Sequence, residues 1–313
     1  MKTVKVRLGS NSYEIRIGPN ILIQTGPWLK EIGFKPEKLV IITDPMVKSL
    51  YGNALKLGLA DEGFRVIILE VPAGEEQKSL ETAARLYYEL SDFYAERTTP
   101  ILALGGGVIG DLAGFVAATY LRGVPLVQIP TTLLAQVDSS IGGKVAVDQG
   151  QLKNKIGAFY QPRLVISDIT TLRTLAAEEL SDGLAEVIKY AVISDKGFFT
   201  YLERNLEQLL TIPSSADGEG WKVRERLLEE IVSRSSKIKA EVVEKDEKDF
   251  GLRNILNYGH TIGHAIESAS DFKVEHGRAV AIGMLLAGEI SSKMGIFDEN
   301  ELARLKGVIE RAG

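Results

Sequence analysis

The sequence predicts an α/β N-terminal domain over residues 1–170 and an all-α C-terminal domain over residues 171–313. The first domain is expected to contain a mostly parallel, Rossmann-like sheet of a non-standard type. This expectation rests on short β-branched runs that alternate with segments of helical periodicity. After about Thr171 the strand-like runs fade and long helical segments follow. With 313 residues, 45% of them hydrophobic, the chain is long enough for two domains with ample cores.

The first half begins with a predicted hairpin, because residues 3–8 and 13–17 alternate apolar and polar side chains around a Gly-Ser-Asn-Ser turn. Later strands are expected in five short β-branched runs, at residues 39–43, 65–71, 101–104, 126–129 and 164–167. Residues 79–93 have the period of a helix. This alternation is typical of a mostly parallel sheet that helices cover.

The second half contains five segments with helical periodicity, at residues 176–193, 221–245, 258–270, 278–293 and 299–311. Residues 212–220 are rich in Pro, Ser and Gly and are expected to form a loop within this helical half. A boundary between two unlike domains is a natural place for a small-molecule site.

Composition excludes several classes of protein. The chain has no cysteine, so disulfides, cysteine-ligated zinc, iron–sulfur clusters and thiol nucleophiles are ruled out. No run of about 18 uncharged apolar residues is present, so a membrane span is not expected. A net charge of −5 argues against a broad nucleic-acid surface. The N-terminal MKTVKVRL alternates instead of forming an apolar signal core, and we expect a cytoplasmic protein.

A glycine-rich stretch, GGGVIGD at residues 105–111, follows a predicted strand and precedes a helix-like segment. Glycines let the backbone approach phosphate oxygens, and the N-terminus of the next helix attracts an anion. The GxGxxG spacing is present, but the acidic residue expected about 20 residues later in a dinucleotide fold is not. The stretch predicts a phosphate loop of non-standard dinucleotide type; a tight turn without a ligand is the alternative.

All three histidines lie close together in the sequence. His260 and His264 are four residues apart in NYGHTIGHAIE, which is a metal-site spacing, and His276 follows before another helical segment. Thr261 stands where a metalloprotease HExxH motif has its glutamate. Because cysteine is absent, the remaining ligands must be carboxylate or water, and an open zinc site of two histidines and one glutamate fits. Histidines that only pack or form hydrogen bonds are the alternative.

Charged and polar residues within or beside apolar and glycine-rich segments are the remaining candidates for a binding site. Glu186 and Lys189 share a face of one predicted helix, and from spacing alone an ordinary surface ion pair is the favoured interpretation. Further polar residues beside glycines or motif segments, each of which alone would be read as solvated, are Lys144, Lys153, Asn154, Lys239 and Arg253. Together they could form a cationic pocket for a substrate with more than one negative charge.

Seven segments match, in order, those of a known family. They are PAGEEQKS (72–79), GGGVIGDLAGFVA (105–117), PTTLLAQVDSSIGGK (130–144), LKNKIGAFYQP (152–162), GLAEVIKYAVI (183–193), LNYGHTIGHAIE (256–267) and HGRAVAIGM (276–284). On these residues the chain resembles the dehydroquinate synthases, which are sugar-phosphate cyclases. The resemblance covers essentially the whole chain.

This resemblance implies an NAD-dependent but redox-neutral reaction of the shikimate pathway. In it, 3-deoxy-arabino-heptulosonate 7-phosphate becomes 3-dehydroquinate by transient oxidation, phosphate elimination, reduction and aldol closure. The implied metal ligands are Glu186, His260 and His276, which replaces the surface-pair interpretation of Glu186. The ion would be Zn²⁺ or Co²⁺. His264 would be left to contact substrate or to relay protons, and the enzyme would be a homodimer.

The resemblance also assigns the binding residues. NAD would contact Glu75, Lys78, Gly106, Gly107, Val108, Asp111, Thr131, Thr132, Lys144, Lys153, Thr171, Leu172 and Thr174. The substrate or reacting groups would be met by Asp138, Lys144, Lys153, Asn154, Lys189, Lys239, Arg253, Asn257 and His264.

The chain departs from the family pattern at four places. Leu152 replaces a usual glycine, Lys155 a usual apolar residue, and Arg278 the acid that commonly follows His-Gly. Family members generally continue past the last helix with further lysines, whereas this sequence ends at Gly313. We therefore expect weaker binding of the substrate phosphate.

Three other functions stay open at this point. An iron- or zinc-containing NAD-dependent polyol dehydrogenase would also combine a glycine-rich N-terminal half with a helical metal-binding half. It does not need so many cationic side chains, because its substrate is not a phosphorylated acid. A related sugar-phosphate cyclase would use the same chemistry on another sugar, although Asn257 and His264 favour dehydroquinate. A catalytically inactive protein that binds NAD or metal is the third.

Overall fold

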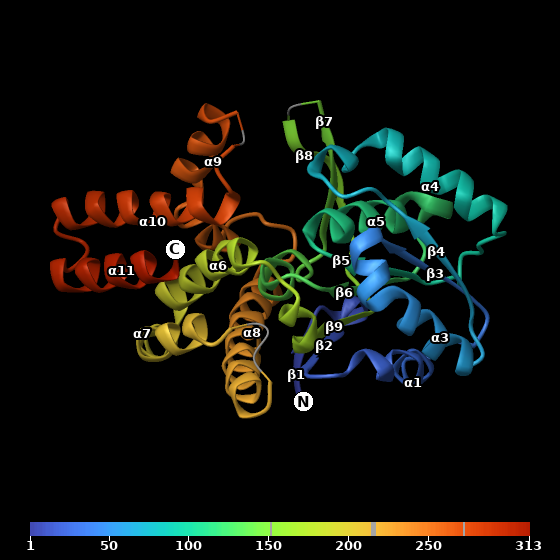
Figure 1. The fold of residues 1–313 in the computed structure, drawn as a ribbon. Helices are drawn as coiled ribbons and strands as arrows, with labels where there is room; N and C mark the ends of the chain where they lie inside the picture. The colour runs from blue at the N-terminus through green and yellow to red at the C-terminus, as the bar shows by residue number, and fades with distance from the viewer. Residues whose placement is uncertain (151, 214–216, 272) are drawn as a thin grey trace. The chain divides into compact units, whose positions relative to one another are not determined.

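The computed structural model describes residues 1–150, 152–213, 217–271 and 273–313. The chain divides into two compact units, Met1–Thr171 and Leu172–Gly313. Figure 1 shows strands and helices in the first unit and helices in the second. The predicted fold class, an α/β region followed by a helical region, is confirmed.

The first unit contains a seven-stranded sheet in the order β1-β2-β9-β6-β5-β3-β4. The strands are β1 (Lys2–Val6), β2 (Tyr13–Gly18), β3 (Lys38–Thr43), β4 (Arg65–Glu70), β5 (Ile101–Gly105), β6 (Leu126–Pro130) and β9 (Leu164–Asp168). The predicted hairpin is confirmed, with Lys2 opposite Ile17 and Val6 opposite Tyr13. All other pairs in this sheet are parallel.

Both faces of the sheet are buried, which explains the continuous apolar runs in its strands. Val40 and Ile42 belong to one core cluster, whereas Leu39 and Ile41 of the same strand belong to the other. The first cluster includes residues of α4 (Leu80–Asp92) and α5 (Gly107–Thr119). The second includes residues of α1 (Thr25–Glu31) and α3 (Asn53–Asp61). The predicted helix at 79–93 is therefore confirmed as α4.

A second hairpin in this unit was not predicted. β7 (Lys144–Gln149) and β8 (Leu152–Phe159) pair antiparallel and form a separate two-stranded sheet. β7 buries Val145 and Val147, but β8 is exposed along almost its whole length. Strand β8 was missed because it lacks the apolar alternation of a half-buried strand.

The described residues of the second unit form six α-helices (Figure 1). They are α6 (Ala177–Ser194), α7 (Lys196–Thr211), α8 (Glu219–Lys245), α9 (His260–Ala269), α10 (His276–Lys293) and α11 (Glu299–Ala312). The five predicted helices are confirmed, but α7 was missed. The Asp195 side chain caps it, and Phe198, Leu202 and Leu206 form its buried face.

Two boundaries differ from the prediction. The predicted loop at 212–220 ends earlier, because α8 already begins at Glu219; residues 214–216 lie outside the described part of the chain. Helix α9 begins at His260 instead of residue 258, because Gly259 has a φ of 81° that ends any helical path before it. Among the described residues, no helix is long and apolar enough to span a bilayer.

Candidate active site

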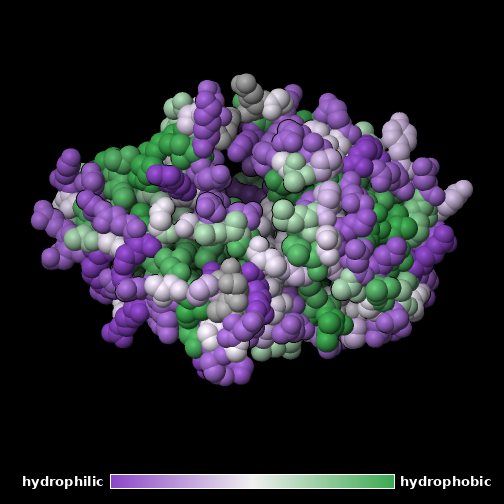
Figure 2. Space-filling view, viewed as in Figure 1, coloured by the Kyte–Doolittle hydropathy of each residue, from purple (hydrophilic) through white to green (hydrophobic). Residues whose placement is uncertain are grey.

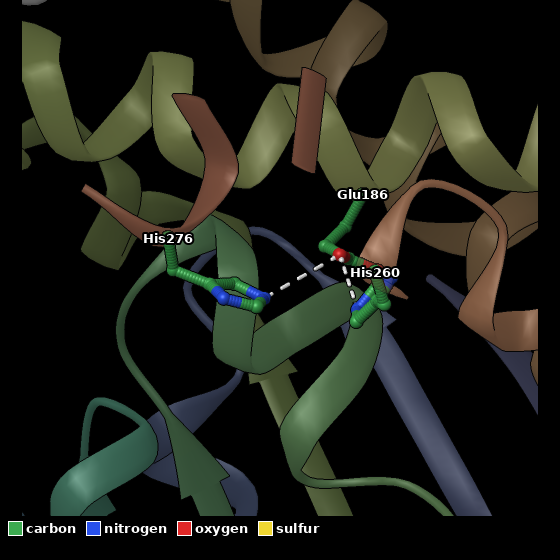
Figure 3. A group of neighbouring side chains, drawn as sticks. All are labelled: Glu186, His260 and His276. Atoms are coloured by element: carbon green, nitrogen blue, oxygen red, sulfur yellow. Dashed lines mark ion pairs between the residues drawn. The ribbon is translucent and has the colours of Figure 1, made fainter. Parts of the chain in front are cut away.

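Three side chains from separate helices of the second unit converge at one point. Glu186 lies on α6, His260 is the first residue of α9, and His276 is the first residue of α10. Glu186 Oε1 is 3.4 Å from His260 Nε2 and 3.7 Å from His276 Nε2. Figure 3 shows both imidazole rings directed toward this one carboxylate oxygen. The structure thus brings together the three residues that were expected to bind the metal.

The donor set fits a divalent cation. One ligand atom from each of these residues lies within 4.8 Å of the others. Two imidazole nitrogens and a carboxylate oxygen are the ligands of open catalytic zinc sites, which leave further positions for water or substrate. Cobalt accepts the same ligands.

Close contact between helices fixes the place of the two histidines. A Cβ atom on Gly283 of α10 would collide with the carbonyl oxygen of Gly259, which directly precedes His260. α9 can therefore begin against the side of α10 only because glycine stands at this position. On the other side, the Asp182 carboxylate of α6 accepts a hydrogen bond from the backbone N–H of Gly277. This bond joins the N-terminus of α10 to the helix that carries Glu186.

Glu186 and Lys189 form a buried ion pair, so the interpretation as a surface pair from spacing alone is wrong. Their exposed fractions are 0% and 1%. The error has a physical reason: α6 is covered by other helices on this face, and spacing within one helix does not reveal such a cover. Breaking a buried pair costs far more than breaking an exposed one.

The pKa values of the two histidines are shifted in opposite directions. Burial lowers the pKa of His276, but Glu186 and Glu267 outweigh burial and raise it to about 10. Burial lowers the pKa of His260, and its interaction with Glu186 does not reverse this. Burial also raises the pKa of the Asp182 carboxyl.

His264 is not part of the group around Glu186. Its ring centre is 5.4 Å from that of His260 and 6.1 Å from that of His276, and its side chain is exposed. The HxxxH spacing therefore indicates two histidines on one helix but not two ligands of one ion. His264 forms a second possible ligand group with Glu267 and His276.

Several expected substrate residues lie in the same unit. Lys189, Lys239 and Arg253 are buried cations, and Asn257 is exposed. Arg253 Nη1 donates to the Glu247 carbonyl at 3.1 Å, and the Asp246 carboxylate accepts from the Arg253 backbone N–H at 3.0 Å. The backbone N–H groups of Arg253, Phe250 and Gly251 donate to the Asp246 carboxylate and lower its pKa. The Asp246 and Glu247 bonds hold the turn η8 (Leu252–Asn257), which contains both Arg253 and Asn257.

The glycine-rich stretch forms a strand-to-helix turn in the first unit. Gly105 ends β5, and α5 begins at Gly107. A Cβ atom on Gly106 would lie 3.2 Å from Thr132 Cγ2, so only a residue without a side chain leaves this space open. Gly105 pairs with Pro130 in the neighbouring strand, which places Thr131 and Thr132 at the same carboxyl edge of the sheet. Ligands of open parallel sheets bind at this edge.

A buried lysine lies close to this turn. Lys78 Nζ is 2.9 Å from Asp111 on α5 and 3.7 Å from Glu75. Burial lowers the pKa of Lys78, but the two carboxylates outweigh burial and the pKa is raised. Lys78 is therefore a charged cation beside the glycine turn, held by two carboxylates.

The other expected site residues differ in how deeply they are buried. Asp138 is half-buried in the turn η6 (Ala135–Ser139), and Lys144, Lys153 and Asn154 are exposed on the β7–β8 hairpin. Gly107 and Val108 open α5. Thr171 and Leu172 are buried, and Thr174 is exposed. Three positions that depart from the family pattern, Leu152, Lys155 and Arg278, are exposed.

Sequence reasoning missed two residues of the site, Glu267 and Asp182. Glu267 is buried, with Oε1 3.4 Å from His276 Nδ1. It lies seven residues after His260, which is two helical turns, and this spacing could have indicated it. Asp182 lies four residues before Glu186 on the same helix. Its partner is a backbone N–H that is distant in the sequence, and no pattern reveals such a contact.

These features define a class of protein. An α/β unit with a glycine turn and a buried cation, together with a helical unit that holds a Glu-His-His group, is typical of enzymes that use a nucleotide and a metal. Residues 68–182 match the family 3-dehydroquinate synthase N-terminal, and residues 183–313 match 3-dehydroquinate synthase C-terminal. The chain belongs to the 3-dehydroquinate synthase family.

Individual relatives agree with this assignment. The 3-dehydroquinate synthase of Desulforamulus reducens is 49% identical over 314 residues, which span 100% of this chain and 84% of that protein. The 3-dehydroquinate synthase of Dehalococcoides mccartyi is also 49% identical, with the same coverage.

Solved structures of other cyclases share the fold. A 2-deoxy-scyllo-inosose synthase complexed with carbaglucose-6-phosphate, NAD⁺ and Co²⁺ has a TM-score of 0.88 and 27% identity, and the match covers 99% of this chain and 82% of that one. The 2-epi-5-epi-valiolone synthase of Streptomyces hygroscopicus, with NAD⁺ and Zn²⁺ bound, has a TM-score of 0.86 and 29% identity, covering 98% and 82%. Glycerol dehydrogenase from Schizosaccharomyces pombe, at 16% identity and a TM-score of 0.69, shares the fold alone; that match covers 95% and 75%.

Proposed function

We propose that this protein is a 3-dehydroquinate synthase, a carbon–oxygen lyase that converts 3-deoxy-arabino-heptulosonate 7-phosphate into 3-dehydroquinate and phosphate. The observation that supports this most directly is the convergence of Glu186, His260 and His276 in a chain of that family. The reaction combines a transient oxidation, loss of phosphate, reduction and an intramolecular aldol closure, so that no net NAD is consumed.

The residues of the helical unit hold the substrate. Lys189, Lys239 and Arg253 are cations in low-dielectric surroundings, where their attraction for a carboxylate or phosphate is stronger than in water. Asn257 and the exposed His264 supply hydrogen bonds, and His264 can pass a proton. Such fixed charges orient the substrate so that its own phosphate can serve as the base.

The cofactors would be held by separate groups of residues. Glu186, His260 and His276 would bind the divalent ion, and the residues around the glycine turn, with Lys78 beside them, would bind NAD. When bound, NAD accepts and returns a hydride, and the ion acidifies the hydroxyl that is oxidised. The Gly105–Gly107 backbone and the start of α5 would meet the NAD phosphates.

A phosphate-release assay on the heptulosonate phosphate tests this function. We expect phosphate release with constant NADH absorbance, loss of activity on treatment with a chelator, and recovery on addition of Zn²⁺ or Co²⁺. Activity that is indifferent to the chelator would contradict the metal assignment. NADH accumulation with a simple alcohol would indicate a polyol dehydrogenase instead.

A related cyclase activity on another sugar phosphate is the specific alternative for the substrate. The two cyclases with similar structures are named for valiolone and inosose products, and their identity of 29% and 27% leaves a related cyclase activity open. Identification of the product as 3-dehydroquinate decides between them. Tight NAD binding without any turnover would instead favour the catalytically inactive protein.

We also propose that the enzyme acts as a cytoplasmic homodimer, as the family resemblance implies. Ile282, Leu286 and Ile290 are exposed at four-residue intervals on α10, and Figure 2 shows hydrophobic surface in the area that α10 occupies. Exposed apolar surface of this kind is typical of a face that a partner covers. Light scattering measures the mass directly, and a monomer would contradict the proposal.

Replacing Lys78 by Met is expected to weaken NAD binding ten- to hundredfold, because a hydrogen bond to a charged group contributes about 1.5–3 kcal/mol. Lys78 is the buried cation beside the glycine turn. Isothermal titration with NAD measures the change. Lys56→Met, which removes an exposed cation from α3 of the same unit, is the matched control and should leave NAD affinity unchanged.

A further inference from the structure

The two histidines near Glu186 have the same arrangement of oxygen neighbours around their rings. Each presents Nε2 to Glu186 Oε1, at 3.4 Å for His260 and 3.7 Å for His276. Each also has an oxygen beside Nδ1, the other ring nitrogen. For His260 this is the carbonyl oxygen of Tyr258 at 3.3 Å, and for His276 it is Oε1 of Glu267 at 3.4 Å.

With an ion bound at Nε2, this arrangement selects one tautomer of each ring. A neutral histidine that binds a cation through Nε2 carries its proton on Nδ1, and an acceptor beside Nδ1 favours that state and fixes the angle of the ring. The acceptor for His260 is part of the backbone and comes two residues earlier. The acceptor for His276 is a side chain from another helix, so it can be removed by substitution.

Glu267 is placed for this role by the packing of α9 on α10. Glu267 is only 5% exposed, and burying a carboxylate is costly unless a partner compensates its charge. A Cβ on Gly263, one turn before Glu267, would lie 3.2 Å from backbone atoms of Ala279 and Val280. α9 therefore lies directly against the first turns of α10, which begins with His276.

We propose that Glu267 is a positioning residue of the metal centre: its carboxylate accepts a hydrogen bond from Nδ1 of His276 and holds Nε2 toward Glu186. This proposal rests on the proposed function only in requiring that Glu186, His260 and His276 bind a divalent ion. Glu267 acts through His276 and does not itself contact the ion.

Glu267 could instead be a ligand of a second metal ion, and that role predicts a different number of bound ions. His264, Glu267 and His276 also have ligand atoms within 4.8 Å of one another. An ion there would need Nδ1 of His276, so that the ring would have to bridge two ions when Nε2 is also bound. In that case the chain would bind two ions, and Glu267 would be a ligand of the second.

Cobalt titration of the protein without substrate tests the proposal, with Co²⁺ binding followed by its visible absorption bands. We expect one Co²⁺ per chain. Glu267→Ala should weaken its binding about 10- to 100-fold, the usual effect of losing such a partner of a ligand. Glu267→Gln keeps an oxygen that can accept the same hydrogen bond, so its loss should be smaller. Both variants should shift the cobalt bands at saturating metal.

The control is Glu289→Gln, which neutralises an exposed carboxylate on α10 and should change neither affinity nor spectrum. Circular dichroism of the metal-free proteins checks folding, and if Glu267→Ala does not fold, Glu267→Gln decides the question. Unchanged cobalt affinity and bands in the folded variants would overturn the proposal. So would two Co²⁺ per chain with only the second lost on substitution. A wild-type protein that binds no Co²⁺ would instead refute the metal assignment of the proposed function.

Discussion

Replacing Glu186 by Gln is expected to reduce phosphate release roughly 1,000-fold or more. Glu186 supplies the only carboxylate oxygen of the Glu-His-His group, and its loss removes a charged ligand from the ion. A bound ion contributes several kcal/mol to stabilisation of the transition state, and about 4 kcal/mol corresponds to a factor of roughly 1,000. Steady-state phosphate release and the metal content of the purified variant measure the two effects.

The same substitution should also destabilise the metal-free protein, because it leaves the Lys189 ammonium buried without the Glu186 carboxylate. Removing one partner of a buried pair costs about 3–5 kcal/mol of unfolding free energy. The double variant Glu186→Gln, Lys189→Met should recover much of this stability but none of the activity. If the double variant binds metal and turns over substrate normally, Glu186 is not a ligand.

Replacing Gly277 by Ala is expected to lower kcat/KM about 100-fold, although glycine to alanine within a helix usually stabilises. The new Cβ would collide with the carbonyl oxygen of Asp182 and lie 2.7 Å from its Cα. The start of α10 would have to move away from α6, and with it His276 would move away from Glu186. A misplacement of about 1 Å at a reacting site can cost a factor of 100.

A matched glycine in the same unit separates this effect from a general one. Gly307 lies within α11, and a Cβ there meets nothing within 4 Å. Gly307→Ala should leave kcat/KM unchanged and raise the unfolding free energy by about 0.4–1 kcal/mol. Equal activity of both variants would show that contact between α6 and α10 does not set the geometry of the Glu-His-His group.

The predicted fold agrees with the structure where the residue pattern is strong. The five parallel strands near 39–43, 65–71, 101–104, 126–129 and 164–167 were found because a sheet covered on both faces needs apolar runs. β8 and α7 were missed for different reasons. β8 is exposed along nearly all its length, so no burial pattern marks it. α7 does have an apolar period, which was overlooked.

The site could be predicted from the sequence only in part. The family resemblance indicated Glu186, His260 and His276 as metal ligands. Spacing alone favoured a surface ion pair for Glu186, which is wrong, and it paired His260 with His264. Helical spacing reports neighbours on one helix, but the Glu-His-His group joins three helices. Glu267 and Asp182 had no assigned role, because each acts on a residue of a different helix.

The sequence by itself determined the change from alternating strands and helices to helices alone, the glycine turn after β5 and the supply of side chains for a metal. These follow from local periodicity and from residue chemistry. Only the tertiary structure decided which ring nitrogen faces which carboxylate, that Lys189 is buried, and that α9 and α10 meet through glycines. Those properties depend on distances between segments far apart in the chain, which are set by packing and not by any local pattern.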